Sequence, residues 1–148
     1  MKRILAILFL LPMAFVSCGE DEDNFVQQNY LVGKWEINET GARSPQGVIV
    51  YQPYVNNTDC KDNYIFNADF TFQNNDYNTE GTCVSNAING TYSRLSTNVT
   101  LNYTIQGSGG APQQVQQTLT VVSLTFTEVI LAYTNDVNQI VYLKCTKV

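Results

Sequence analysis

Cysteine is the residue type with the clearest chemistry in this 148-residue chain, because histidine is absent. Without histidine the sequence lacks the commonest general base and the commonest metal ligand. A cysteine nucleophile needs a base beside it, so no catalytic residue can be nominated and we expect a protein that is not an enzyme. The aspartates are spaced too irregularly for a calcium-binding loop, and we expect neither a metal ion nor a cofactor.

Cys18 follows a leader that has the proportions of an export signal. Two basic residues precede an apolar stretch over residues 4–16, which is too short to cross a bilayer as a stable helix. Residues 15–18, Phe-Val-Ser-Cys, resemble a bacterial lipobox, with phenylalanine where leucine is usual. The resemblance implies that residues 1–17 are removed as a signal peptide and that Cys18 carries the lipid. An ordinary signal peptide with an incidental cysteine is the alternative.

The residues after Cys18 form a short acidic run. Residues 20–23 are all acidic and no apolar side chain occurs in residues 19–24, so residues 18–29 are expected to be a solvated tether. Such a run also resembles the export signal of surface lipoproteins in one phylum of Gram-negative bacteria. We therefore expect a lipid-anchored protein of the outer membrane, exposed at the cell surface. A simple spacer is the alternative.

The charge balance excludes one class of partner. The chain has a formal net charge of −5, and its few lysines and arginines do not cluster. No basic patch is available for nucleic acid, so none is expected as a partner. After Cys18 no apolar stretch is long enough for a transmembrane helix, so the membrane is expected to be contacted through the lipid anchor.

The rest of the chain has the pattern of consecutive β-strands, each with one apolar face. Alternate residues of a strand share a face, and residues 99–105 show this alternation most clearly. Asn67-Ala68-Asp69 has the composition of a hairpin turn. The predicted strands span residues 31–37, 64–66, 70–72, 90–95, 99–105, 115–122, 129–133 and 140–145, and residues 48–51 are either a short strand or a lid segment.

Eight consecutive antiparallel strands have two solutions, a closed up-and-down barrel or a two-sheet sandwich. The succession of hairpins and the near absence of long crossovers favour the barrel. In a closed barrel the first and last strands are neighbours, so main-chain pairing is predicted between residues 31–37 and residues 139–146.

An ordered series of motifs resembles the lipocalin-like domain of small lipoproteins from the same bacterial phylum. The matching segments are Leu31-Val32-Gly33-Lys34-Trp35, Cys60-Lys61-Asp62 before Tyr64-Ile65-Phe66, Asn67-Ala68-Asp69, Cys83, Gly90-Thr91-Tyr92, and Leu124-Thr125-Phe126-Thr127 before Val129-Ile130-Leu131. The resemblance covers roughly residues 30–148 and implies one small calycin-like barrel, but it implies no particular ligand. The sequence departs from the pattern at Asp69-Phe70, where a turn glycine is common, and at the extra Cys145.

Three cysteines follow Cys18, and the oxidising envelope allows them to pair. Cys60 and Cys83 enclose one predicted hairpin, which would bring them within reach, so they are the expected disulfide. Cys60–Cys145 is the alternative pairing. Cys145 shares a strand face with Val141 and Leu143 and is expected to be a buried free thiol.

Three residues are candidate ligand contacts: Arg94, Tyr92 and Tyr103. Arg94 follows Tyr92 on one strand face, and an inward arginine in a small barrel can hold a ligand carboxylate, whereas an arginine at a strand end is otherwise solvated. The tyrosines form either an amphipathic cavity wall or part of the core. The candidates for that wall are Tyr51, Tyr54, Tyr64, Tyr92, Tyr103, Tyr133 and Tyr142.

Trp35 is expected to plug the closed end of the barrel, and a place in the wall of a ligand cavity is the alternative. Resemblance to lipocalins implies that a basic side chain from the last strand covers its ring, and Lys144 or Lys147 is placed to do so. Function is expected to be the binding of a small apolar ligand. The alternative is a surface interaction or accessory subunit whose barrel core is filled, and an internal cavity would separate the two.

Overall fold

The computed structural model describes residues 30–57, 59–78, 82–107 and 110–148. The predicted signal peptide, Cys18 and the acidic tether lie outside the described residues. In the described part no helix is long and apolar enough to cross a bilayer. The nine strands are β1 (Gly33–Arg43), β2 (Ile49–Pro53), β3 (Asn63–Phe66), β4 (Thr71–Tyr77), β5 (Ser85–Leu95), β6 (Asn98–Gln106), β7 (Pro112–Leu124), β8 (Glu128–Thr134) and β9 (Ile140–Lys147).

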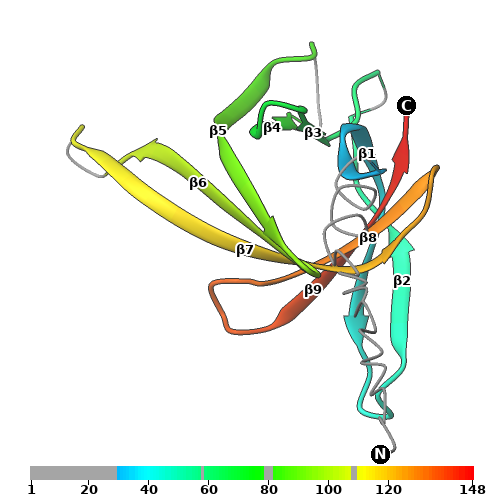
Figure 1. Ribbon diagram of the computed structural model, residues 1–148. Helices are drawn as coiled ribbons and strands as arrows, with labels where there is room; N and C mark the ends of the chain where they lie inside the picture. Colours follow the sequence, from blue (N-terminus) through cyan, green and yellow to red (C-terminus); the bar gives the residue numbers. More distant parts are fainter. Residues whose placement is uncertain (1–29, 58, 79–81, 108–109) are drawn as a thin grey trace, which may run out of the picture.

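Pairing between β1 and β9 closes the sheet into an antiparallel barrel of eight strands (Figure 1). The register runs from Trp35 opposite Lys147 to Ala42 opposite Val141. The predicted pairing of first and last strands, and with it the closed barrel, is confirmed. Of the nine described strands, β2 lies outside the barrel. It pairs with the second half of β1, residues Glu39–Arg43, and the two extend together as a hairpin beyond the barrel wall.

Most strand boundaries differ from the prediction; β1 and β4, for example, end at Arg43 and Tyr77 instead of residues 37 and 72. Two differences at strand starts have a clear local reason. β1 begins at Gly33 because Leu31 lies in a helical turn, where its carbonyl oxygen accepts a hydrogen bond of 2.6 Å from Trp35 Nε1. β5 begins at Ser85 instead of residue 90, because its polar first half pairs with β4 through the main chain. Apolar alternation does not report a strand of this kind, since neither of its faces is buried in a core.

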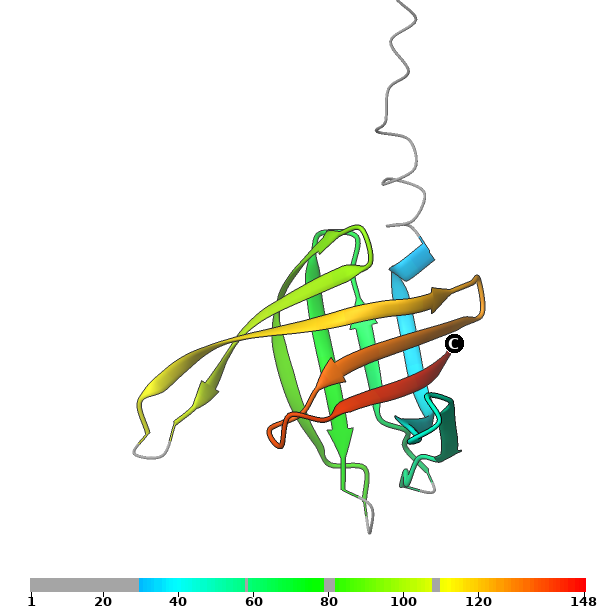
Figure 2. The same cartoon turned by 90° about the horizontal axis from the view of Figure 1, so that it is seen from below.

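Apolar side chains fill one end of the barrel, which we call the sealed end. It comprises Leu31, the β3–β4, β5–β6 and β7–β8 turns, and the last residues of β9 (Figure 2). The inward side chains behind it are almost fully excluded from solvent: Leu31, Trp35, Phe66, Tyr92, Val99, Leu101, Leu119, Val121, Val129 and Leu131. Trp35 is completely buried, as expected of a plug.

Lys147 covers the Trp35 ring. Its ammonium nitrogen lies 5.0 Å from the ring centre and donates a hydrogen bond of 3.2 Å to the Tyr30 carbonyl oxygen. Gly33 makes this possible: its φ is +140°, and a Cβ there would lie 2.5 Å from Lys147 Cε. Of the two lysines predicted for this position, Lys144 instead points outward, with its ammonium nitrogen within 4 Å of carboxylate oxygens of Glu39 and Glu128.

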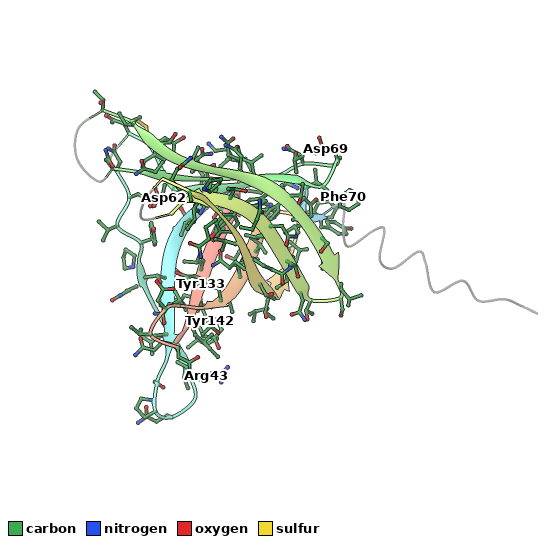
Figure 3. The ribbon with its side chains drawn as sticks, turned by 90° about the vertical axis from the view of Figure 1, so that its left-hand side faces the viewer. Arg43, Asp62, Asp69, Phe70, Tyr133 and Tyr142 are labelled. Atoms are coloured by element: carbon green, nitrogen blue, oxygen red, sulfur yellow. A yellow bond between two sulfur atoms is a disulfide. The ribbon has the colours of Figure 1, made fainter. Side chains whose placement is uncertain are left out.

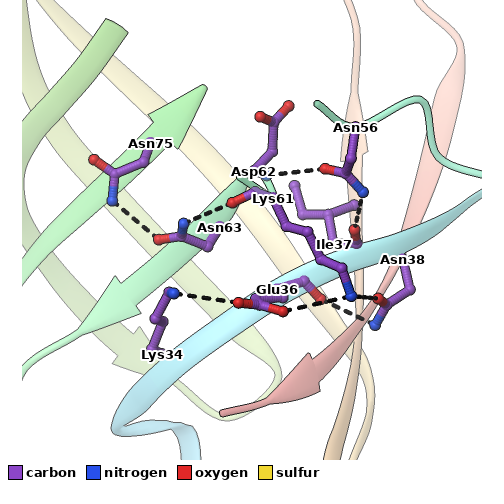
Figure 4. A network of polar contacts seen from close by, with 9 residues as sticks. All are labelled: Lys34, Glu36, Ile37, Asn38, Asn56, Lys61, Asp62, Asn63 and Asn75. Atoms are coloured by element: carbon purple, nitrogen blue, oxygen red, sulfur yellow. Dashed lines mark hydrogen bonds and ion pairs between the residues drawn. The ribbon is translucent and has the colours of Figure 1, made fainter. Parts of the chain in front are cut away.

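A polar network fastens the segment between β2 and β3 to the outside of β1 (Figure 4). Asn56 donates a hydrogen bond of 2.8 Å to the Ile37 carbonyl oxygen and accepts one of 2.9 Å from the Asp62 amide. The Ile37 amide in turn donates to the Asp62 carbonyl oxygen at 2.9 Å. These bonds hold residues 54–57 and 59–62 at the end of the barrel opposite to the sealed end, although this part of the sequence has no regular pattern.

The opposite end, which we call the open end, is wider because two strands leave the barrel. The β5–β6 ladder stops at Gly90 and Tyr103, and the β7–β8 ladder stops at Thr120 and Ala132. Beyond these points β6 and β7 pair only with each other and project as a two-stranded arm (Figures 1 and 2). The arm consists of residues 104–106 and 112–119.

Candidate ligand-binding site

Inward side chains at the open end are only partly buried, unlike those at the sealed end. Tyr54, Ile88, Tyr103, Tyr133 and Val141 pack against the core and still reach solvent. They come from five different segments of the barrel and its connections, so they surround the mouth instead of lining one wall. Figure 3 shows Asp62 and Tyr133 toward this end, and Asp69 and Phe70 at the other. The mouth therefore presents aromatic rings and two aliphatic side chains, which suit a ligand with an apolar body.

Tyr64 forms the floor of this mouth. Its side chain points inward from β3 and is 95% buried, but within the described residues its hydroxyl makes no hydrogen bond. Among those residues no fully enclosed side-chain oxygen or nitrogen lacks a partner, so the Tyr64 hydroxyl is not fully enclosed and keeps a small contact with solvent. Burial raises the pKa of Tyr64, and Tyr54, Tyr103, Tyr133 and Cys145 are its neighbours. It is thus a neutral hydroxyl, able to donate to or accept from a ligand.

Two carboxyl groups lie at the rim. Asp62 is buried and accepts hydrogen bonds from the Tyr54 hydroxyl at 2.9 Å and from the Tyr77 amide at 2.8 Å. Burial, and then the negative charge of Asp62, raise the pKa of the nearby Asp76. Burial and the bond to Asp62 likewise raise the pKa of Tyr54. The rim is therefore rich in oxygen acceptors and favours donor or cationic groups on a ligand.

Two hollows flank the projecting arm at the open end. The first has a volume of about 860 Å³ and lies between β5 and β6, where Asp76, Ile88 and Ile105 line it. The second, about 380 Å³, lies between the arm and β8, with Tyr103 and Thr134 in its wall. Both are large enough for a small organic molecule, and both adjoin the ring of partly buried side chains.

The structure does not bring the three predicted ligand contacts together. Arg94 and Tyr103 both point inward, but they are opposite Val99 and Gly90, four residues apart along β5 and so separated by roughly 13 Å. Tyr92 lies in the sealed core, where its hydroxyl donates to the Asn67 carbonyl oxygen at 2.9 Å. Arg94 is near the sealed end and donates through Nε to the Ser96 carbonyl oxygen at 2.9 Å. Only Tyr103 belongs to the open end.

The other tyrosines of the predicted wall divide into two groups. Tyr54, Tyr64 and Tyr133 join Tyr103 at the open end, whereas Tyr51 and Tyr142 face outward. There the Arg43 guanidinium lies over the Tyr142 ring and donates to its hydroxyl at 3.0 Å. Four of the seven candidate tyrosines therefore form the wall at the open end: Tyr54, Tyr64, Tyr103 and Tyr133.

The cysteines have the expected arrangement. Cys60 and Cys83 form a disulfide with a Cα–Cα distance of 5.8 Å, which ties the segment before β3 to the start of β5 at the open end. Cys145 is a free thiol in the core, and burial raises its pKa to about 12. Among the residues that the structure describes, no three cysteine or acidic side chains are placed to hold a metal ion.

Sequence reasoning missed the two rim carboxyl groups. Asp62 and Asp76 are fourteen positions apart, Asp62 just before β3 and Asp76 near the end of β4, and no single motif contains both. Their proximity follows from the β3–β4 register, in which Asn63 is opposite Asn75. A pairing of Asn63 with Asn75 places the residues just outside them, Asp62 and Asp76, next to each other. The hairpin turn at residues 67–69, which was predicted, was the one available signal.

Comparison with known proteins places these features in context. A sequence model described as a lipocalin-like domain matches residues 31–131. No curated protein matches the chain. A lipocalin-like protein from Bacteroides uniformis is similar in structure, with a TM-score of 0.52, 14% identity, and coverage of 80% of this chain and 99% of that one. An uncharacterized protein from Bacteroides eggerthii aligns with a TM-score of 0.48, 17% identity and the same coverage.

Proposed function

Because the chain belongs to the lipocalin-like domain family, we propose that it binds a small, largely apolar ligand in the open end of its barrel. In this proposal a lipid on Cys18 anchors the protein to the outer membrane, with the barrel exposed at the cell surface. The role is binding and not catalysis. The leader, the lipobox and the acidic run at residues 20–23 support the location.

The Tyr64 hydroxyl is the observation that supports ligand binding most directly. A tyrosine that only fills a core normally finds a partner for its hydroxyl, because an unsatisfied buried polar group costs about 1–3 kcal/mol. At the sealed end Tyr92 follows this rule through its bond to Asn67. Tyr64 departs from it at the floor of a mouth lined by aromatic rings. A ligand that enters the mouth would supply the missing partner.

A pair of conservative variants tests this assignment. The neutral hydrophobic fluorophore N-phenyl-1-naphthylamine is titrated into the purified protein that lacks residues 1–17. Saturable binding at one site is expected. Tyr64→Phe should weaken that binding several-fold and leave the urea midpoint nearly unchanged, because no protein hydrogen bond is lost.

Tyr92→Phe is the matched control, since it removes the same atom from a hydroxyl that does have a protein partner. It should lower stability by about 1 kcal/mol and leave probe binding unchanged. If both variants bind the probe like the unmodified protein, the Tyr64 floor is not a ligand contact. Mass spectrometry of material extracted from the natively purified protein would then identify the natural ligand or find none.

The packing at the sealed end is consistent with the second candidate function, that of a surface interaction or accessory subunit. Half of the barrel interior is occupied by side chains such as Trp35, Phe66 and Leu131, as expected of an interaction subunit with a packed core. A protein that yields no extracted ligand and does not bind the fluorophore would support that function. The anchor is tested separately: Cys18→Ala should leave the protein soluble or as uncleaved precursor, and an unchanged outer-membrane fraction would contradict lipidation.

A further inference from the structure

A wedge-shaped slot separates β5 and β6 at the open end. Its two sides are residues Ser85–Asn89 of β5 and Thr104–Gln106 of β6, which lie beyond the last paired residues, Gly90 and Tyr103. Each side remains part of a regular strand, because β5 pairs with β4 as far as Ser85 and β6 pairs with β7 as far as Gln106. The slot, which contains the 860 Å³ hollow, is therefore bounded by two ordered strand edges. Figure 1 shows the two strands diverging.

Main-chain groups on both edges point into the slot. The Tyr92 amide donates to Phe70 of β4, and hydrogen-bonding residues alternate along an antiparallel strand. Ser85, Ala87 and Asn89 therefore direct their N–H and C=O groups away from β4, toward β6. On the opposite edge, the Gly107 amide donates a hydrogen bond to the Ala111 carbonyl oxygen, so Gly107 directs its main-chain groups toward β7.

By that alternation Thr104 and Gln106 direct their main-chain groups toward β5. The slot thus offers donors and acceptors from two sides, with no residue paired across it in the described part of the ladder. A group that satisfies both edges must itself alternate donors and acceptors on both sides. An extended peptide backbone has that property.

Neither edge carries the usual protection against strand addition. Natural edges are commonly blunted by charged residues or proline. Residues 85–93 and 95–127 contain no charged side chain, and no proline occurs on either side of the slot. At the apex, Gly90 lets β5 and β6 approach closely, since a Cβ there would lie against the Asn102 carbonyl oxygen.

The side chains around the slot define what an added strand would carry. The 860 Å³ hollow lies between the two edges, and its inward wall includes Ile88 and Ile105 near the apex and Asp76 farther out. Asp62 lies beside Asp76; burial, and then the negative charge of Asp62, raise the pKa of Asp76. An inward apolar residue followed two positions later by a basic residue would match this wall. Outward residues would lie beside Ala87 and Thr104, which favour small or polar uncharged neighbours.

We propose that this slot binds an extended peptide segment of another protein, by adding it as a strand between β5 and β6. The segment is about five residues long, with an apolar and then a basic side chain directed into the barrel. This site shares Ile88 and Asp76 with the mouth but does not use the Tyr64 floor, and the inference does not depend on a small-molecule ligand.

The test uses the protein without residues 1–17 and the probe peptide acetyl-Thr-Val-Thr-Lys-Thr-amide. Titration is followed by the backbone amide resonances of the ¹⁵N-labelled protein. The amides of Ala87, Asn89 and Thr104 should shift progressively with peptide, while sealed-end amides stay in place. The same peptide with N-methylated backbone amides should lose the effect, because it cannot pair with a strand. Exchange of its lysine for glutamate should weaken binding at least fivefold.

Two proline variants distinguish main-chain pairing in the slot from nonspecific peptide binding. Ala87→Pro removes an N–H that faces the slot and leaves the β4 ladder intact, so peptide affinity should fall at least fivefold. Gln116→Pro is the matched control, because its N–H faces away from β6 on the free outer edge of the arm, and it should bind like the unmodified protein.

Three results would overturn the proposal. They are equal shifts with the N-methylated peptide, undiminished affinity in Ala87→Pro, or no slot-amide shifts at millimolar peptide. Slot shifts that depend on protein concentration without peptide would assign the edges to a second copy of the chain, which also rejects it. None of these results bears on fluorophore binding at Tyr64.

Discussion

The two ends of the barrel are built from the same strands but differ in every physical respect. β5 illustrates this: after Gly90 it is paired on both sides and carries the buried Tyr92, whereas before Gly90 it is paired on one side and is largely exposed. At the sealed end apolar burial and complete ladders act together. At the open end hydrogen bonds, a disulfide and a few tyrosines hold the wall. Stability is thus concentrated away from the surface that is available for binding.

The largest test of this difference is Trp35→Ala. Trp35 is completely buried, and truncating such a side chain should cost about 3–5 kcal/mol, measured as the shift in the urea unfolding curve. Ile105→Ala is the open-end counterpart; its side chain is 38% exposed, and the loss should stay below about 1 kcal/mol. Similar losses for the two variants would mean that the ends do not differ in packing.

Loss of the Cys60–Cys83 disulfide should have the next largest effect. The bond closes a loop with a sequence separation of 23, for which the chain-entropy model gives roughly 3 kcal/mol. The Cys60→Ser/Cys83→Ser double variant should melt at a lower temperature, and its slot and rim amides should exchange faster than sealed-end amides. Uniformly faster exchange at both ends would contradict a disulfide that acts on the open end.

Burial of Cys145 should make the stability of the protein depend on pH in the alkaline range. Its pKa is raised to about 12 by burial, so the unfolded chain releases the thiol proton at lower pH than the folded protein does. Its contribution to stability is therefore fully present below about pH 9 and is lost as pH rises above it, by roughly 1.4 kcal/mol per unit. Cys145→Val should remove this loss between pH 9 and pH 10. An identical pH dependence in the variant would show that the thiol is not sealed.

The smallest expected effect concerns the cover over Trp35. Lys147→Met keeps an apolar stem on the ring but removes the ammonium group and its bond to Tyr30. A loss of about 0.5–1 kcal/mol is expected in chemical denaturation, in the range of an exposed cation–π contact. Lys144→Met is the control from the same strand. Lys144 makes outward ion pairs and a longer contact of 5.9 Å with the outward-facing Tyr51 ring, and it covers no buried side chain, so its loss should be smaller still.

Local patterns predicted the parts of the fold that depend on neighbouring residues. Alternation in residues 99–105 located β6, and the turn composition of residues 67–69 located the β3–β4 hairpin. Successive hairpins then favoured a closed barrel over a two-sheet sandwich, which led to the predicted β1–β9 pairing and the buried Trp35. The Cys60–Cys83 disulfide followed from the same hairpin order.

The candidate site was less accessible to such reasoning. Arg94 and Tyr103 share an inward face, which the strand period predicts, but their separation along the barrel axis depends on the β5–β6 register. No single motif contains both Asp62 and Asp76, and only the β3–β4 pairing brings them together. The slot between β5 and β6 is invisible in the sequence, because the strand pattern continues on both sides of the point where pairing stops.

The sequence by itself determined the strand order, the inward and outward faces, the cysteine pair and the plug, since each depends on short-range periodicity or on chain order. Tertiary structure alone decided which tyrosines meet at the mouth, which lysine covers Trp35 and where two strands separate. Those outcomes depend on register and on the space each side chain occupies across the barrel. A shift of two residues in one ladder would keep every face and change every one of these contacts.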